Sequence, residues 1–365
     1  MAYAPNFKNE MVAVDTISHS GAASNTVNVG FKPSWVFAKT TTNGDGGFAF
    51  GEPTGLVMID PEDTLAPAIV SEGLTSFVAN GFTHGTSNKL VINNKQTVYQ
   101  CWKGSGSTGA VNSSGTITAN VSANASIGFS ITKYTGNGTA DSTIPHGLGK
   151  KPEVIFFLSS SQKQDVGAWC VDIPNKSTMR FANGDILQTR QLGGKTQQTS
   201  ILNSTDPTKT LITLGNNVAC NDNGETFAAI AWRSVKGVSK AGYYLGTAGN
   251  EKNINPFVYT GFKPSMLIIK SLTTIGSNNW RVINLLQNNN NADTTGRRLF
   301  NPKGMRDDWR HENGDARSHE INLYSNGFGI VGKGNEISDN EVIYFYMAFA
   351  KEAIVSTNNI PTTGV

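Results

Sequence analysis

The chain has 365 residues, of which 38% are hydrophobic, only 16% are charged and 39 are glycine. Its 30 basic and 27 acidic residues leave a formal net charge of +3, which indicates neither a nucleic-acid-binding protein nor one that attracts acidic substrates. No apolar run approaches the length of a membrane span and the N-terminus carries no secretion-signal pattern, so we expect folding in a cytoplasm without membrane insertion.

One short pattern occurs three times: a glycine, then a proline, then a run of apolar, β-favouring residues. The prolines are Pro33, Pro152 and Pro264, separated by 119 and 112 residues. Glycine permits a positive φ, and proline fixes φ and lacks an N–H, so each copy predicts a turn that leads into a buried strand. The spacing predicts one small domain repeated three times.

Before the first unit, residues 1–12 show no periodicity and are predicted to form an N-terminal arm. The first unit, 13–103, closes on an aromatic strand after a hairpin at Asn80-Gly81. Residues 104–114 are rich in Gly, Ser and Thr and predict a flexible linker. The strands predicted for this unit are 12–17, the run after Pro33, 47–50, 74–79 and 97–102.

The second unit, 115–238, and the third, 239–355, repeat the same order of parts, and a short tail follows at 356–365. From the proline to the next aromatic strand the three gaps are 15, 17 and 16 residues. The second unit lacks the Asn-Gly-Phe turn of the other two, so its hairpin must be built differently. The second unit is predicted to pass through 128–138, the strand after Pro152, 168–171 and 211–215, and to close on 226–233. The third is predicted to use 241–246, the strand after Pro264 and 280–283, and to close on 342–349.

These features predict an all-β chain of three tandem antiparallel β-sandwich domains, of jelly-roll or lectin-like type. The sequence contains no long run with helical period, and a glycine or Asn-Gly break recurs about every ten residues. The aromatics Trp102, Trp232 and Phe349 occupy matching places in the closing strands, which indicates core packing. Whether the units stack in a line or pack around one another stays open.

No pattern for catalysis or metal binding stands out, so we expect no enzymatic activity, no cofactor and no metal. The three cysteines form no CxxC pair and are expected to be reduced and packed, and His146 is expected in a surface loop. The pairs His311-Glu312 and His319-Glu320 lack zinc-site spacing. Two acids are needed to cleave a glycan, but Asp60, Glu62 and Asp63 lie in one proline-containing loop typical of a solvated turn.

The most unusual stretch is 297–312, which follows the polar run 287–291 and combines aromatic, arginine and aspartate side chains. Such a mixture suits a loop that binds sugar or protein, because a ring offers a flat apolar face and polar groups fix orientation. A charged loop pinned by packing of Trp309 on its own domain is the simpler interpretation. The candidate ligand or host contacts are Arg306, Trp309, Arg310 and His311.

The chain resembles a family of virion proteins of tailed phages, common in marine and cyanobacterial phages and built from tandem β-rich units of this size. The resemblance lies in residues 134–138 leading to Gly147 and Pro152, in 259–264 leading to 325–328 and 346–350, and in the ending at 359–363. It is weaker over the first unit. The family is described as tail fibre or structural, so the resemblance implies part of a virus particle and gives no contact residues.

We therefore expect a virion structural protein, a tail fibre or tail-attached appendage that contributes to host attachment, assembled in the host cytoplasm. A capsid decoration protein and a glycan-depolymerising tailspike are the alternatives. The expected partners are other virion proteins, further copies of the chain with a trimer favoured, and a glycan or protein of the host surface, with no nucleic acid.

Overall fold

The structure is a computed structural model in which antiparallel β-sheets dominate and the described helices, α1 (Val218–Asn221) and α2 (Asn335–Ser338), have four residues each. The all-β prediction is confirmed. The residues that the structure describes are 12–18, 25–40, 48–58, 67–70, 72–87, 90, 96–162, 167–170, 186–187, 195–196, 201–247, 256–271, 281–284, 299–300, 321–331, 335–340 and 342–350.

The first unit contains a four-stranded sheet in the order β1-β9-β3-β4 and a three-stranded sheet in the order β2-β8-β7. A two-stranded sheet, β5-β6, completes it. All pairs are antiparallel. The strands are β1 (Val12–Ser18), β2 (Asn25–Asn28), β3 (Trp35–Thr40), β4 (Phe48–Gly51), β5 (Val57–Met58), β6 (Ala68–Ile69), β7 (Leu74–Val78), β8 (Gly81–His84) and β9 (Gln96–Trp102).

The second unit contains a six-stranded sheet in the order β10-β11-β12-β19-β14-β15 and the two-stranded sheets β13-β18 and β16-β17. Its strands are β10 (Ala110–Asn112), β11 (Ala119–Asn124), β12 (Phe129–Thr135), β13 (Ser142–Pro145), β14 (Val154–Ser159), β15 (Gly167–Cys170), β16 (Ile186–Leu187), β17 (Lys195–Thr196), β18 (Leu211–Leu214) and β19 (Thr226–Trp232).

The third unit contains a five-stranded sheet in the order β20-β27-β22-β23-β24 and a three-stranded sheet in the order β21-β26-β25. Its strands are β20 (Ser239–Leu245), β21 (Phe257–Tyr259), β22 (Pro264–Ser271), β23 (Arg281–Asn284), β24 (Leu299–Phe300), β25 (Ile321–Tyr324), β26 (Gly327–Ile330) and β27 (Ile343–Ala350).

The main sheets repeat one order of strands: opening strand, closing strand, proline strand and aromatic strand. This order is β1-β9-β3-β4 in the first unit, β12-β19-β14-β15 in the second and β20-β27-β22-β23 in the third. In each unit the residues of the main and smaller sheets share one buried cluster. The strands predicted from the glycine and proline pattern are therefore confirmed, whereas β2, β13 and β21, each just before the glycine turn, were not predicted.

The hairpins of the first and third units close onto the glycine turns that precede the proline strands. The carbonyl oxygen of Asn80 accepts from the N–H groups of Val29 and Gly30 at 2.8 and 3.0 Å, and that of Asn326 accepts from Thr260 and Gly261 at 3.0 Å each. Gly30 and Gly261 have φ of 86° and 83°. One carbonyl oxygen thus fixes a left-handed turn that other residues rarely adopt, which explains the repeated glycine.

Each closing strand is buried on both faces, because alternate side chains enter different cores. In β27, Tyr344, Tyr346 and Ala348 face the core of the third unit, while the residues between them, Phe345, Met347 and Phe349, enter a second cluster. In β19 the same alternation places Ile230 and Trp232 in that second cluster. A period of two therefore divides each closing strand between its own unit and a shared core.

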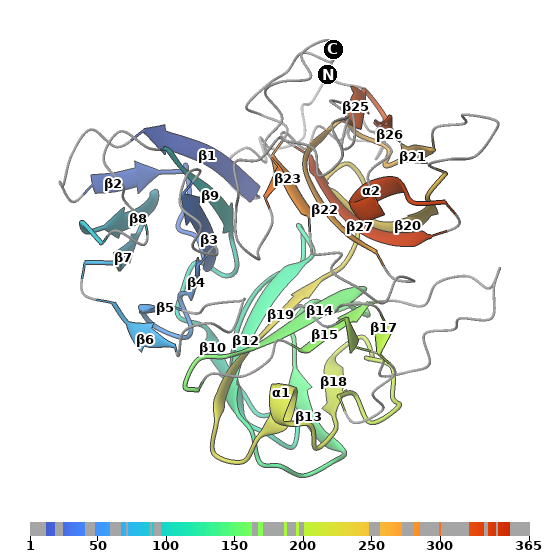
Figure 1. Cartoon of the computed structure of the whole chain (residues 1–365). Helices are drawn as coiled ribbons and strands as arrows, with labels where there is room; N and C mark the ends of the chain where they lie inside the picture. Colours follow the sequence, from blue (N-terminus) through green and yellow to red (C-terminus); the bar gives the residue numbers. More distant parts are fainter. Residues whose placement is uncertain are drawn as a thin grey trace, which may run out of the picture.

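The shared core joins the three units. It contains side chains of the first unit (Trp35 and Trp102), of the second (among them Phe129 and Ile230) and of the third (among them Met266 and Phe349). Figure 1 shows the three groups of sheets arranged around this centre, with the blue to teal strands of the first unit, the green to yellow strands of the second and the dark yellow to red strands of the third. The units pack around one another, which answers the question that the sequence left open.

Part of the predicted linker belongs to the sheet of the second unit. Within 104–114, β10 adds an edge strand to the six-stranded sheet by pairing with β11. Gly104 is buried, and a Cβ on it would lie 2.4 Å from Ser122 Oγ and 2.6 Å from Ser34 Oγ. The chain therefore passes between the first two units in close contact with both.

Candidate functional site

The contact residues expected from the sequence, Arg306, Trp309, Arg310 and His311, lie outside the described residues. So do the acidic loop with Asp60, Glu62 and Asp63, and the pairs at 311–312 and 319–320. Among the residues that the structure does describe, no group of three or more His, Cys, Asp and Glu side chains is placed to hold a metal ion.

Aromatic rings from all three units meet at the centre of the shared core. The ring centroid of Trp102 lies 5.9 Å from that of Trp232 and 5.8 Å from that of Phe349, both edge to face, and 6.2 Å from that of Phe129. All four side chains are buried. The sequence prediction of core packing for the matching aromatics is confirmed, and this core is one shared by the units.

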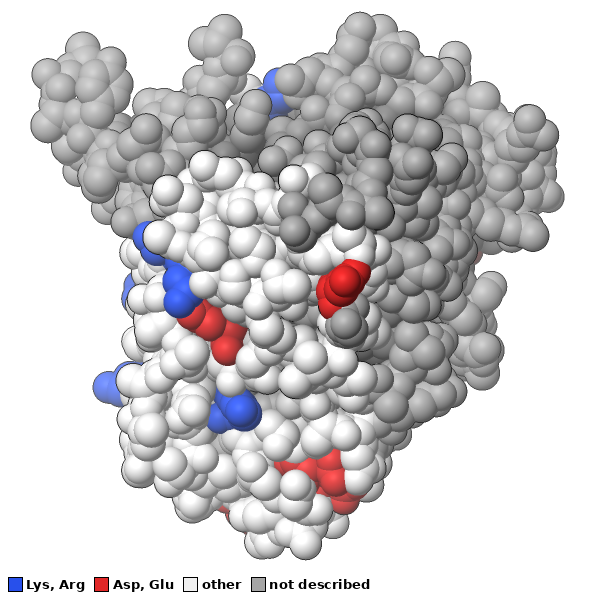
Figure 2. All heavy atoms as spheres, turned by 90° about the vertical axis from the view of Figure 1, so that its left-hand side faces the viewer, with Lys and Arg blue, Asp and Glu red and all other residues white. Residues whose placement is uncertain are grey.

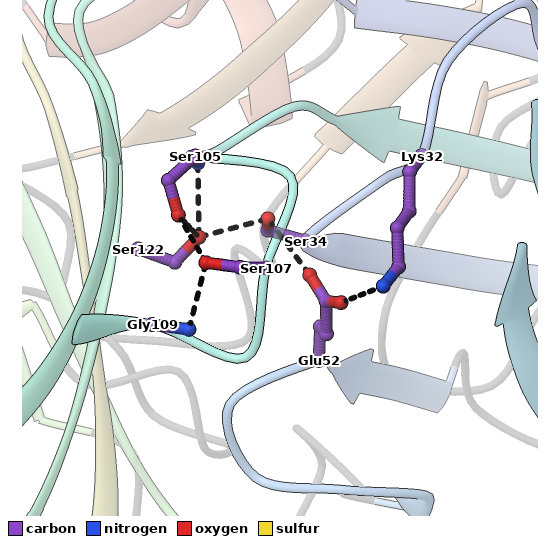
Figure 3. A network of polar contacts seen from close by, with 7 residues as sticks. All are labelled: Lys32, Ser34, Glu52, Ser105, Ser107, Gly109 and Ser122. Carbon is purple, nitrogen blue, oxygen red and sulfur yellow. Dashed lines mark hydrogen bonds and ion pairs between the residues drawn. The ribbon is translucent and has the colours of Figure 1, made fainter. Parts of the chain in front are cut away.

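A polar network lies where the first unit meets the second (Figure 3). Lys32 Nζ lies 2.5 Å from Glu52 Oε1, and Ser34 Oγ donates to Glu52 Oε2 at 3.4 Å. Ser34 Oγ also lies 3.0 Å from Ser122 Oγ, which accepts from Ser105 N–H at 3.0 Å. Because Ser34 and Ser122 are fully buried, neither hydroxyl can reach a substrate. The network satisfies buried polar groups at the junction and has no catalytic geometry.

A matching polar contact lies where the second unit meets the third. Glu153 accepts from the N–H of Ser234 at 2.9 Å and from its hydroxyl. Glu153 follows Pro152 in the same way that Ser34 follows Pro33. Ser234 Oγ in turn accepts from Ala241 N–H at 2.9 Å. Both junctions thus pair the residue after the proline with polar groups beside the next unit, which fixes the entry of the following strand.

The expectation of a surface loop for His146 is wrong. The side chain is fully buried, Nδ1 accepts from Leu148 N–H at 3.3 Å, and Nε2 lies 3.3 Å from Thr208 O. With Nδ1 accepting, Nε2 carries the proton and donates to the carbonyl oxygen. His146 thereby ties the second unit's glycine turn to the segment before β18, the place where the other units use their Asn-Gly hairpin.

Acid is expected to destabilise the protein through this histidine. Burial lowers the pKa of His146 from its ordinary value of 6.5, and the Thr208 carbonyl offsets only part of the shift. The unfolded chain therefore binds the proton first, so this contribution is complete above about pH 6.5 and is lost as the pH falls. Unfolding free energies from about pH 7.5 to about pH 5 should fall more steeply for the native protein than for His146→Gln. Equal slopes would show that His146 does not contribute.

The three cysteines, Cys101, Cys170 and Cys220, are buried thiols, as expected from their sequence context. Burial raises the pKa of the Cys220 thiol to about 12, so it is neither ionised nor reactive near neutral pH. None of the described helices is long and apolar enough to span a bilayer. On the face shown in Figure 2 the charged side chains of the described residues are few and scattered, which does not resemble a polyanion-binding surface.

An exposed aromatic surface lies on the smaller sheet of the third unit, β21-β26-β25. Phe257, Tyr259 and Tyr324 are 51%, 58% and 45% exposed. Phe257 and Tyr259 point to the same side of β21 because Val258 between them is buried, and Tyr324 lies on the same side of β25. The ring centroids of Phe257 and Tyr324 are 5.4 Å apart, edge to face. We call these three side chains the aromatic face.

Glycines on the central strand make room for these rings. Gly327 pairs with Tyr259 on one side and Tyr324 on the other, and Gly329 pairs with Phe257 and Asn322. A Cβ on Gly327 would lie 2.8 Å from the Phe257 ring, and one on Gly329 would lie 3.1 Å from the Tyr324 ring. The rings therefore lie across the middle of the sheet as a shallow apolar surface.

A lysine borders the aromatic face at its Tyr259 end. Lys240 Nζ lies 5.2 Å from the centroid of the Tyr259 ring and donates to Tyr259 O at 2.7 Å. The cation lies beside the ring and is held there by the carbonyl oxygen, so its position relative to the aromatic face is fixed.

The corresponding surfaces of the other two units are not aromatic. Pairing of Val27 with Phe82 matches that of Val258 with Phe328, which places Thr26 and Asn28 where the third unit has Phe257 and Tyr259. In the second unit Ile144 pairs with Ile212 in the same way, which places Thr143 and Pro145 at the positions of Phe257 and Tyr259. The fold therefore does not require aromatic residues at these places, and their presence in one unit alone calls for a functional reason.

Sequence reasoning missed the aromatic face. Residues 257–259 alternate aromatic, valine, aromatic, a pattern that also fits a strand buried on both sides. The repeat itself could have revealed it. When the three glycine turns are aligned, Phe257 and Tyr259 occupy positions that hold polar residues in the first unit.

Comparison with known proteins places the chain in a family. No curated protein and no solved structure matches the chain significantly. A family model, described as a domain of unknown function (DUF7483), matches residues 10–353 and so spans all three units. Because this match covers most of the sequence, the chain belongs to the DUF7483 family.

Proposed function

We propose that this chain is a structural and adhesive protein of a tailed-phage particle, and that its units are three homologous β-sandwich domains in a tail fibre or tail-attached appendage. The repeated order of strands supports the homology of the units. The resemblance to tandem β-unit virion proteins supports the place in a virus particle. Other virion proteins and further copies of this chain, as a trimer, are its proposed partners.

The observation that carries the adhesive role is the aromatic face. Covering half-exposed rings with a ligand is favourable because apolar surface is removed from water. Scattered single hydrophobic residues are normal on protein surfaces, but they do not form a cluster like this one. The places of Phe257 and Tyr259 are taken by Thr26 and Asn28 in the first unit and by Thr143 and Pro145 in the second. One unit therefore offers a contact surface, while the shared core holds all three units as one body that can transmit a load.

The location of the protein in purified particles tests the proposal. Cryo-electron microscopy is expected to show the chain on the tail in a few to some tens of copies per particle. Hundreds of copies in a lattice on the head would replace the adhesive role with that of a capsid decoration protein. Absence of the chain from particles would overturn the proposal.

Adhesion is the second arm of the same test. Purified protein is expected to bind the surface of host cells, and a Tyr259→Ala variant to bind at least tenfold less while keeping its melting temperature within a few degrees. Thr26→Ala, on the same outward side of the first unit at the place that matches Phe257, is the control and should bind as the native protein does.

A further inference from the structure

Building on the adhesive role proposed above, we propose that the aromatic face binds a carbohydrate chain, with Phe257 and Tyr259 each stacking against the C–H face of a pyranose ring and Tyr324 completing the surface. Lys240 borders the Tyr259 ring as a polar group that can bond to sugar hydroxyls.

The ring geometry suits sugars. The C–H groups on one side of a pyranose form a flat apolar surface, and its hydroxyls project around the rim, so the best partner is a flat ring with polar groups at its edges. The planes of Phe257 and Tyr324 lie at 76° to each other, so a sugar that stacks on the face of Phe257 meets the edge of Tyr324. Tyr259 is the most exposed of the three and lies next to Lys240, which places an ammonium group at the rim of the surface.

The aromatic face alone does not supply the area of an interface with a second copy of the chain. An aromatic side chain offers roughly 200 Å², so three half-exposed rings offer about 300 Å². A stable protein–protein interface needs about 800 Å² from each partner. A chain of a few sugar rings needs no larger surface than this one.

The sheet face offers side chains but no main-chain groups. The N–H and C=O groups of β26 are engaged with β21 and β25 on its two sides. A peptide that adds to a sheet bonds to the main chain at an edge, so a ligand on this face depends on the rings and their polar rim. A carbohydrate fits that requirement because stacking supplies its affinity.

The test exchanges the aromatic face for the residues that the first unit carries. The double variant Phe257→Thr/Tyr259→Asn takes the residues of positions 26 and 28, which the same strand geometry accepts. Native and variant proteins are titrated with a neutral β-glucan, a galactan, a uronic-acid polysaccharide and lipopolysaccharide from the host, by calorimetry and on a glycan array. The control variant is Thr26→Ala/Thr83→Ala, on the corresponding sheet of the first unit.

The native protein and the control are expected to bind at least one of these polysaccharides with equal affinity, and the double variant to bind at least tenfold more weakly with an unchanged melting temperature. If the double variant loses thermal stability as well as affinity, the test is repeated with Tyr324→Val. This variant takes the valine of position 78, the matching position in the first unit. Equal binding by native and variant proteins, or no binding to any polysaccharide, overturns the inference.

The two proposals fail in different ways. One outcome identifies the ligand as a protein. In that case the double variant no longer adheres to host cells, the native protein binds no polysaccharide, and protease treatment of the cells abolishes adhesion of the native protein. The adhesive role then stands and the carbohydrate inference falls. If the native protein does not adhere to cells but binds a polysaccharide through the aromatic face, the site stands and the adhesive role falls.

Discussion

Replacing Trp102 with alanine is expected to lower the free energy of unfolding by about 3–5 kcal/mol and to split one unfolding transition into more than one. The Trp102 ring contacts Phe129 and Trp232 of the second unit and Phe349 of the third. Its removal leaves a cavity that no single unit can close, so the units lose their mutual support. Urea unfolding, followed by fluorescence and by far-ultraviolet circular dichroism, measures both effects.

Phe82→Ala is the matched control for this prediction. Phe82 is fully buried in the core of the first unit alone, with its ring 5.0 Å from that of Tyr99. Its loss should cost a similar free energy, about 3–5 kcal/mol, while the two probes still change together. If Trp102→Ala also unfolds in one coincident transition, the shared core does not couple the units.

Gly81→Ala is expected to destabilise the protein by about 3 kcal/mol or more, a cost found where a side chain meets fixed backbone. A Cβ at this position would lie 1.8 Å from Val27 O and 2.9 Å from its carbonyl carbon. Gly81 and Val27 lie on the paired strands β8 and β2, so the clash can be relieved only by moving the strands apart. Thermal and urea denaturation give the change in stability.

Gly106→Ala separates the clash from the ordinary effect of losing a glycine. Gly106 has a φ of 75° and an added Cβ would meet nothing within 4 Å, so its replacement should cost only about 1 kcal/mol. Gly327→Ala repeats the experiment in the third unit, where the Cβ would lie 2.2 Å from Val258 O. Similar small losses at all three glycines would argue against the clash.

The strands could be predicted because their signals are local. A glycine turn, a proline and an apolar run specify β3, β14 and β22 within about ten residues, and three copies of the same pattern exclude chance. The Asn-Gly hairpins were also predicted, although for a different physical reason. The turn residues of the first hairpin are Ala79 and Asn80, and Gly81 is needed for close approach to Val27 rather than for a left-handed φ.

The shared core could not be predicted because it depends on contacts between distant segments. The sequence indicates that Trp102 and Trp232 are buried. It does not indicate which core they enter, because the hydrophobic effect is non-directional. The same limit applies to His146, whose buried role depends on Thr208 O, 62 residues away. For the aromatic face, burial on one side of β21 had to be known before Phe257 and Tyr259 could be distinguished from core residues.

The double burial of the closing strands has a consequence for synthesis. The chain emerges from the ribosome in order, and domains fold as units while synthesis continues. The first unit can therefore form its own core while Trp35 and Trp102 still face water, because their partners Met266 and Phe349 are made more than 150 residues later. We expect the nascent chain to expose an apolar surface for that interval, which makes it a substrate for chaperones until the last closing strand arrives.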